Sequence, residues 1–193
     1  LEEQLLNIAK LRQDFYGFQN LKLALSPNEM ELPVQIGEFD TILMSGVFEH
    51  LLPAERLQLL PKVWGHLKTG GILFISQLQH RYFPFEMHTT RLPLINYMPD
   101  RVALWCARRF SKKVKQNETW EGLLRRGIRG GTNREILRIL DSSSTKPDFL
   151  EPRHNNVKDH IDLWFQVTAS TRSSWVKKIE LFIIRMVKRL TGQ

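Results

Sequence analysis

The amino-acid sequence predicts an α/β protein built on a parallel sheet, and features of its first half support this fold class. Two apolar runs, Phe39–Ser45 and Ile72–Leu78, are predicted strands, and the segment between them has the apolar periodicity of a helix. A strand, a helix and a strand at this spacing are typical of a right-handed parallel crossover. The almost continuous apolar character of Phe39–Ser45 predicts a strand buried on both faces of the sheet.

Two further elements are predicted before the first of these strands. Residues 1–15 are predicted to form an amphipathic helix because their apolar side chains recur on one helical face. The apolar run Leu21–Leu25 predicts another strand, which the turn-forming residues 26–28 would close.

The helix between the strands is expected to begin near Pro53, since the first helical turn tolerates a missing amide hydrogen. Pro61 falls inside this helix, and we expect a bend or break there because proline removes one helical hydrogen bond. Gly70 and Gly71 are expected to end the helix in a left-handed turn. The predicted buried stripe consists of Leu57, Leu60, Trp64 and Leu67.

Apolar periodicity is weaker beyond residue 79, where aromatic residues, prolines and histidines are frequent. The predicted elements there are helices near residues 100–115, 118–126 and 132–141, and weak strands near residues 147–151 and 161–168.

The C-terminal helix, residues 175–190, has the clearest pattern, with a broad apolar arc opposite five lysines and arginines. Two interpretations stay open: the helix packs on the sheet with its basic face in solvent, or residues 174–190 lie in a membrane interface. No apolar run approaches the roughly 20 residues that span a bilayer, and the start lacks a signal-peptide pattern. We therefore expect a cytoplasmic protein, which is membrane-associated if the second interpretation holds.

Composition and charge narrow the function classes. The chain has 193 residues, of which 42% are hydrophobic and 25% are charged, so a folded domain is expected. Its one cysteine, Cys106, excludes an internal disulfide and a multi-thiolate metal site, and we expect it to be a small buried residue.

The charge is distributed unevenly along the chain. Residues 1–100 contain 8 Lys/Arg and 11 Asp/Glu, whereas residues 101–193 contain 20 Lys/Arg and 9 Asp/Glu, so the second half predicts an anionic partner. Nucleic acid is not the expected partner, because the segment RRGIRGGT occurs once and is interpreted as a basic loop.

Four short motifs occur in order between Glu31 and Ser76: Leu-Pro at 32–33, Phe-Asp at 39–40, Glu-His-Leu at 49–51 and Leu-Lys-x-Gly-Gly at 67–71. With these motifs, residues 1–78 resemble the middle of a class I S-adenosylmethionine-dependent methyltransferase of the type 11/ubiquinone-biosynthesis-like superfamily. The resemblance implies a Rossmann-like sheet, S-adenosylmethionine as the cofactor, and methyl transfer to a small-molecule or lipid-linked acceptor.

The resemblance also implies positions for the cofactor, at loops that follow the strands. Asn28 and Glu29 would flank the adenine, although plain turn chemistry explains both residues equally well. Ser45, Gly46 and Val47 would lie beneath the cofactor, where Gly46 allows a close approach to the backbone.

Catalytic candidates are the histidines and the acidic residue near the implied methyl-transfer cleft. Glu49 and His50 would open the helix after the strand 39–45, and for His50 a capping or surface histidine is an equal alternative. A base is needed only if the acceptor must lose a proton, and His80, Glu86 and His88 are the candidates. We expect no metal site, because His80 and His88 lack the spacing of two ligands on a helix.

The segment HRYFPFEMHTTRLPLINYMP, residues 80–99, resembles an acceptor-covering lid of bacterial members of the family. Its aromatic residues, including Tyr82 and Phe83, would wall the acceptor site, and Arg91 would bind an anionic group.

The Gly-rich loop and the acidic residue with which this family binds its cofactor have no counterpart in the sequence, since the glycines at 127, 130 and 131 follow no predicted strand. We therefore expect an N-terminally truncated methyltransferase without its first two strands, which by itself binds the cofactor poorly. The expected organisation is a partial methyltransferase domain over residues 1–170, with a helical lid or acceptor insertion at 79–145, and a basic amphipathic helix over residues 171–193. The alternative is a catalytically inactive methyltransferase-like module that binds a partner or a membrane surface.

Overall fold

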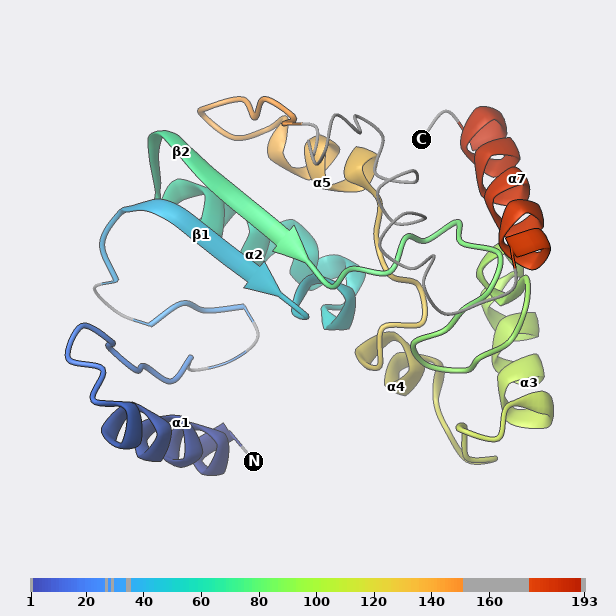
Figure 1. Cartoon of the computed structure of the whole chain (residues 1–193), viewed down its shortest axis with the longest axis horizontal. Helices are drawn as coiled ribbons and strands as arrows, with labels where there is room; N and C mark the ends of the chain where they lie inside the picture. The colour runs from blue at the N-terminus through green and yellow to red at the C-terminus, as the bar shows by residue number, and fades with distance from the viewer. Residues whose placement is uncertain (1, 27, 29, 34–35, 151–173, 192–193) are drawn as a thin grey trace.

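The computed structural model describes residues 2–26, 28, 30–33, 36–150 and 174–191 (Figure 1). Glu29 and the predicted strand at 161–168 lie outside the described residues. The elements in chain order are α1 (Glu2–Tyr16), β1 (Phe39–Ser45), the 3₁₀ helix η1 (Phe48–His50), α2 (Pro53–Gly65), β2 (Leu67–Ser76), the 3₁₀ helix η2 (Ile95–Tyr97), α3 (Asp100–Phe110), α4 (Trp120–Arg125), α5 (Asn133–Leu140) and α7 (Ser174–Thr191).

The parallel strand–helix–strand unit is confirmed. β1 and β2 pair in parallel from Thr41 opposite Ile72 to Ser45 opposite Ser76, and α2 connects them. β2 begins at Leu67, earlier than the predicted start at Ile72. The register shifts between Phe39 and Thr41 of β1, so β2 accommodates extra residues there. Gly70 lies in this irregular part with a φ of 81°, which suits glycine.

The predicted end of α2 at the glycine pair is wrong. The helix ends at Gly65, and Gly70 supplies its left-handed conformation inside β2 instead. Of the bend or break expected at Pro61, the break does not occur, because α2 continues through this residue. The carbonyl that loses its helical bond belongs to Leu57, whose side chain is 62% exposed, so this carbonyl lies on the side of α2 where water can replace the bond.

The described residues cover only one face of the sheet. Met44 and Leu60 lie in a buried apolar cluster that β1 and α2 share with α5, and the partly buried Ile75 of β2 packs against it. Leu43 and Phe74 point to the other face and are 67% and 51% exposed. Burial on both faces is therefore not observed, because no described segment packs on this outer face.

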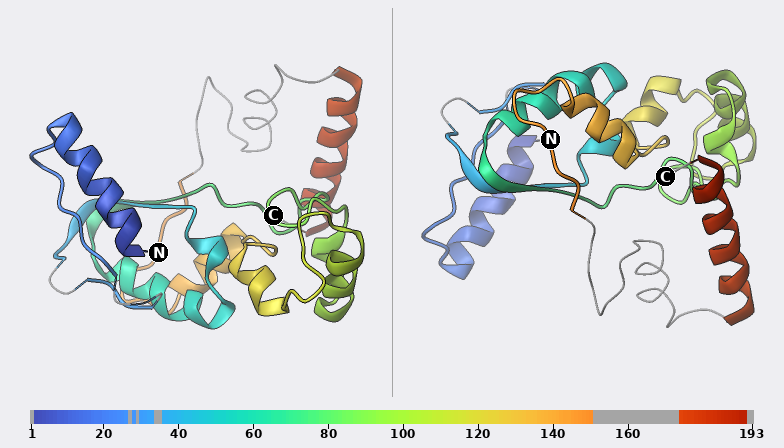
Figure 2. Two further views of the ribbon diagram at one scale, coloured as in Figure 1. Left: turned by 90° about the horizontal axis from the view of Figure 1, so that it is seen from below. Right: turned by 90° about the horizontal axis from the view of Figure 1, so that it is seen from above.

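α1 confirms the predicted N-terminal helix, and it lies on the opposite side of the sheet from α2 (Figure 2). Its apolar residues remain exposed, with Phe15 at 82%. The strand predicted at Leu21–Leu25 is wrong: this segment joins no ladder, and the Gln13 side chain donates to the Leu21 carbonyl at 2.7 Å. The segment is thereby tied to α1 rather than to the sheet.

The three helices predicted between residues 100 and 141 are confirmed as α3, α4 and α5. α3 and α4 share a second apolar cluster, with Ala103, Leu123 and Ile128 at its centre and Cys106 half-buried beside it. α5 returns to the sheet and packs against α2 in the first cluster. No strand forms over residues 147–150.

The C-terminal helix is confirmed as α7, and Figures 1 and 2 place it at the same end of the molecule as α3. Among the described residues, no helix combines the length and apolarity required to cross a membrane.

Candidate functional site

The loops that follow β1 and β2 lie side by side. The Gly46 amide donates to the Ser76 carbonyl at 3.1 Å, which continues the strand pairing by one bond. Gly46 has a φ of 63°, and a Cβ there would lie 3.3 Å from Oε1 of Gln77. The loops that follow the two strands are therefore adjacent at the carboxyl edge of the sheet.

The loop after β1 turns into η1, whose Phe48 and Glu49 are buried. Arg56 of α2 stabilises this turn through two hydrogen bonds. Its Nε donates to the Leu51 carbonyl at 3.0 Å and its Nη2 to the Glu49 carbonyl at 3.3 Å. Its guanidinium also lies 4.7 Å from the Phe48 ring centroid and pairs with Glu135 of α5 at 2.9 Å. The backbone of Glu49 is thus held by a buried arginine that is itself neutralised.

Two histidines from distant parts of the chain meet beside η1. The ring centroids of His50 and His88 are 5.3 Å apart. Nδ1 of His50 lies 2.8 Å from the Arg125 carbonyl, and Nδ1 of His88 lies 2.8 Å from the Arg126 carbonyl. A carbonyl only accepts hydrogen bonds, so each Nδ1 carries a proton, and in the neutral ring Nε2 keeps its lone pair.

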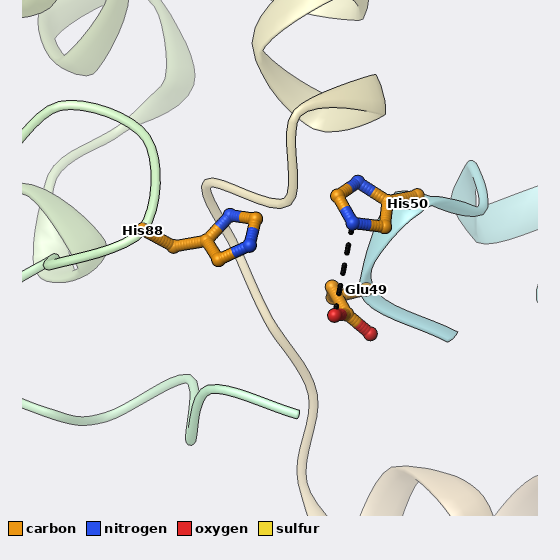
Figure 3. A group of neighbouring side chains, drawn as sticks. All are labelled: Glu49, His50 and His88. Carbon is orange, nitrogen blue, oxygen red and sulfur yellow. Dashed lines mark ion pairs between the residues drawn. The ribbon is translucent and has the colours of Figure 1, made fainter. Parts of the chain in front are cut away.

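Glu49 completes this group. Its Oε1 is 3.7 Å from Nε2 of His50, and its Oε2 is buried without a hydrogen-bond partner. One ligand atom from each of Glu49, His50 and His88 lies within 4.8 Å of the other two. Figure 3 shows the carboxylate and both imidazoles facing one shared space.

The segment RRGIRGGT forms the wall behind this group. Gly127 has a φ of 85°, and a Cβ there would lie 3.0 Å from Nδ1 of His88 and 3.2 Å from Cγ of Glu49. Glycine is therefore required both by the backbone conformation and by the two side chains packed against it.

The charges of this segment are engaged rather than free, which corrects its interpretation as a basic loop. Arg125 makes two hydrogen bonds to Glu55 at 2.6 and 2.7 Å. Arg129 is 4% exposed, donates to the carbonyls of η2 and pairs with Asp100 at 2.6 Å.

Comparison with known proteins identifies the sheet half of the chain. A family model described as a methyltransferase domain matches residues 1–75. This match covers less than half of the chain, and it shows that these residues are similar to a methyltransferase domain. The resemblance read from the four motifs is thereby confirmed for this part of the chain. No curated protein and no solved structure matches the chain.

The structure places the predicted cofactor-binding residues in two separate regions. Ser45 and Val47 flank Gly46 and are exposed at the end of β1. Asn28 uses its side-chain oxygen inside its own turn, where it accepts from the Met30 amide at 2.8 Å. The Met30 carbonyl accepts from Lys62 in the second half of α2, so this turn lies toward the start of β2 rather than at the end of β1.

Glu86 has a structural task. It is fully buried, and its carboxylate accepts from the amides of His88 and Thr89 at 2.8 and 2.7 Å and from the Thr90 hydroxyl at 2.6 Å. The side chain therefore holds the loop that carries His88, and its oxygens face this loop rather than the shared space.

The other acceptor candidates form a separate aromatic group. His80 pairs with Gly131 in a short parallel bridge, and its ring lies 6.0 Å from that of Tyr82. Tyr97 donates its hydroxyl to the Tyr82 carbonyl, and burial, followed by the effect of Tyr82, raises the pKa of Tyr97. Phe83 accepts a hydrogen bond from Asn96 at its carbonyl, 3.4 Å away.

Among the arginines, Arg91 is exposed and has a left-handed backbone with a φ of 59°. Sequence reasoning missed Arg81, Arg56 and Arg129. Burial, followed by the positive charge of Arg129, lowers the pKa of Arg81. Only their contacts with distant residues distinguish these arginines, and no local pattern in the sequence reports such contacts.

Proposed function

We propose that this chain takes part in S-adenosylmethionine-dependent methyl transfer to a small or lipid-associated acceptor. The observation that carries the proposal is the end of β1, where exposed Ser45 and Val47 flank a left-handed Gly46 beside the end of β2. In parallel α/β sheets, ligands bind outside the carboxyl ends of the strands. The family match covers this loop.

Ser45, Gly46 and Val47 fit the cofactor. Gly46 has no side chain and its φ of 63° exposes a backbone surface that few other residues could form. S-adenosylmethionine, when bound, supplies a methyl group on a sulfonium centre. The residues of this chain then have to orient the acceptor and exclude water, because the leaving group needs no covalent help.

His50 and His88 supply the group that removes a proton where the acceptor is a hydroxyl. Each ring is oriented by a carbonyl at Nδ1, so Nε2 is the acceptor atom of the neutral ring. Tyr82 and Tyr97, whose ring centroids are 6.3 Å apart, would form an aromatic wall of the acceptor site.

Cofactor binding tests the proposal. We expect weak binding by residues 1–193, on the order of millimolar, because no Gly-rich loop follows a strand in the described residues. Saturation-transfer NMR with S-adenosylhomocysteine detects such binding. Gly46→Val should remove the signal, whereas Gly65→Ala should not, because a Cβ at Gly65 meets nothing within 4 Å.

Two outcomes would count against these statements. Equal signals from the wild type and Gly46→Val would contradict the placement of the cofactor over the end of β1. Micromolar binding in calorimetry would contradict the expectation that this chain binds the cofactor poorly.

α7 supports peripheral membrane contact. Trp175, Ile179, Phe182 and Met186 recur at helical spacing on one face and are 45–68% exposed. At 100° per residue, the exposed Lys178, Arg185 and Arg189 lie beside this stripe. An exposed apolar stripe next to cations is the pattern of a helix that lies in an anionic membrane surface.

Vesicle flotation tests this contact. The double variant Trp175→Ser/Phe182→Ser should lose binding to vesicles that contain phosphatidylserine, and Phe15→Ser should retain it. Phe15 is a suitable control because it is 82% exposed on α1. Equal flotation of both variants would remove the membrane proposal, and flotation without any cofactor signal would favour the inactive-module alternative.

A further inference from the structure

Three hydrogen-bond acceptors converge beside η1. The lone pairs come from Nε2 of His50, Nε2 of His88 and the carboxylate of Glu49, whose candidate ligand atoms lie within 4.8 Å of one another. Acceptors that face one another repel unless a cation or a proton lies between them.

The two imidazoles are prepared as ligands by their surroundings. A metal-binding histidine commonly donates its other ring N–H to a carbonyl, which fixes the tautomer and orients the ring. Both histidines show this arrangement, with distances of 2.8 Å from Nδ1 to the carbonyls of Arg125 and Arg126. The Arg126 carbonyl is itself held by the Thr89 hydroxyl at 2.5 Å.

Glu49 provides an independent indication of a ligand. The residue is 2% exposed, and its Oε2 has no hydrogen-bond partner. A buried carboxylate oxygen without a partner is costly, so such an oxygen requires an explanation. A cation held by the Glu49 carboxylate and the two imidazoles would compensate the charge of this buried group.

We propose that Glu49, His50 and His88 bind a divalent transition-metal ion such as Zn²⁺. Imidazole nitrogens suit zinc and other first-row transition metals, whereas Mg²⁺ and Ca²⁺ prefer sites made of oxygen ligands. Three protein ligands leave a further position for water or for an oxygen atom of a bound molecule. The proposal does not depend on methyl transfer, and it is an alternative to the role of Nε2 as a base, because a nitrogen lone pair bound to a metal cannot accept a proton.

The site requires only a small closure. Tetrahedral zinc with bonds of about 2.1 Å brings neighbouring ligand atoms to roughly 3.4 Å from one another. The 3.7 Å between Glu49 and His50 is already close to this value. The ring of His88 is exposed and lies on a loop, so its torsion angles can supply the remaining movement.

Gly127 sets the size of this space from behind, because a Cβ there would press on both His88 and Glu49. The same residue lies between the two carbonyls that orient the rings and the rest of the segment RRGIRGGT. The feature that the sequence alone predicted to be a basic loop therefore forms the outer shell of the proposed site.

Binding of Zn²⁺ and Co²⁺ to the purified, tag-free protein tests the proposal. We expect one Zn²⁺ per chain in equilibrium dialysis, visible absorption bands with Co²⁺, and no competition from Mg²⁺ at equal concentration. His88→Gln should weaken Zn²⁺ binding by at least about tenfold and abolish the Co²⁺ bands. Glu49→Gln keeps the shape of the buried side chain and should have the same effect.

His66→Gln is the matched control. Nδ1 of His66 also lies 2.7 Å from a backbone carbonyl, that of Gly37, but His66 is not a member of the Glu49–His50–His88 group. This variant should bind Zn²⁺ like the wild type. Equal Zn²⁺ binding by the wild type and His88→Gln would overturn the proposal in favour of a proton shared by the acceptors. The absence of binding by the wild type at a Zn²⁺ concentration of about 0.1 mM would overturn it as well.

Discussion

The sheet unit, β1–α2–β2, and the crossing segment, residues 79–132, are stabilised in different ways. The sheet unit packs apolar side chains such as Met44 and Leu60 on one face and leaves apolar side chains exposed on the other. The crossing segment has an apolar cluster between α3 and α4, and it also depends on the buried charged residues Glu86 and Arg129, which are bonded to several backbone groups.

This difference explains why the two regions are recognised by different means. Apolar periodicity and the family match identify the sheet unit, and the match ends at residue 75. The crossing segment depends on specific polar contacts that join residues far apart in the sequence. We therefore expect single polar substitutions to be most damaging in the crossing segment and apolar truncations to be most damaging in the sheet unit.

The largest expected effect is that of Arg129→Met. Arg129 donates to the carbonyls of Ile95, Asn96 and Met98 and pairs with Asp100, so the variant leaves several buried groups without partners. We expect a loss of about 4 kcal/mol in the free energy of unfolding, measured by urea denaturation. Arg101→Met, on the exposed face of α3, should change it by less than about 0.5 kcal/mol. Similar values for both variants would show that the polar network is not what stabilises this region.

A pair of leucine variants sharpens the comparison within the sheet unit. Leu60 is fully buried, and Leu60→Ala should cost about 3 kcal/mol because it leaves a cavity in the first cluster. Leu43 is 67% exposed on the outer face, and Leu43→Ala should cost less than about 0.5 kcal/mol. A large effect at Leu43, in the same denaturation assay, would show that the outer face is covered in solution.

The smallest expected effect is at the exposed ion pair of the two strands. Lys68 lies 2.9 Å from Asp40, and its hydrogen bond and charge lower the pKa of the Asp40 carboxyl. A carboxyl with a lower pKa in the folded state stabilises that state above its unfolded pKa, and this contribution is lost as the pH falls through the folded value. Asp40→Asn should therefore be slightly less stable than the wild type near neutral pH, and the difference should shrink as the pH falls below the usual range of an aspartate pKa. A stability difference that persists in acid would contradict this account.

The sequence predicted most helices and both strands of the sheet because their apolar side chains repeat with a clear period. Two errors share one cause. The run Leu21–Leu25 has the composition of a strand but no neighbour to pair with, and Gly70 has the properties of a helix end but lies inside β2. Local composition reports what a segment prefers, whereas pairing partners decide what it becomes.

The sequence predicted several residues of the candidate site, but it did not predict how they are arranged in space. His50, Glu86 and His88 were all selected, and the structure separates a carboxylate that holds a loop from two histidines that face a common space. Glu49 was placed beside His50 near the cleft but was not selected as a catalytic residue, because nothing in the local sequence shows that one of its oxygens is buried without a partner. The comparison of His88 with His80 did not reveal its actual neighbour, His50, which belongs to another loop.

The carbonyls that orient His50 and His88 belong to adjacent residues, Arg125 and Arg126, which lie 75 and 38 residues from their respective histidines. One turn of the backbone therefore orients both rings, and any movement of that turn displaces the two imidazoles together. Such a pair forms or is lost in a single step, after the long chain closures that bring these segments together.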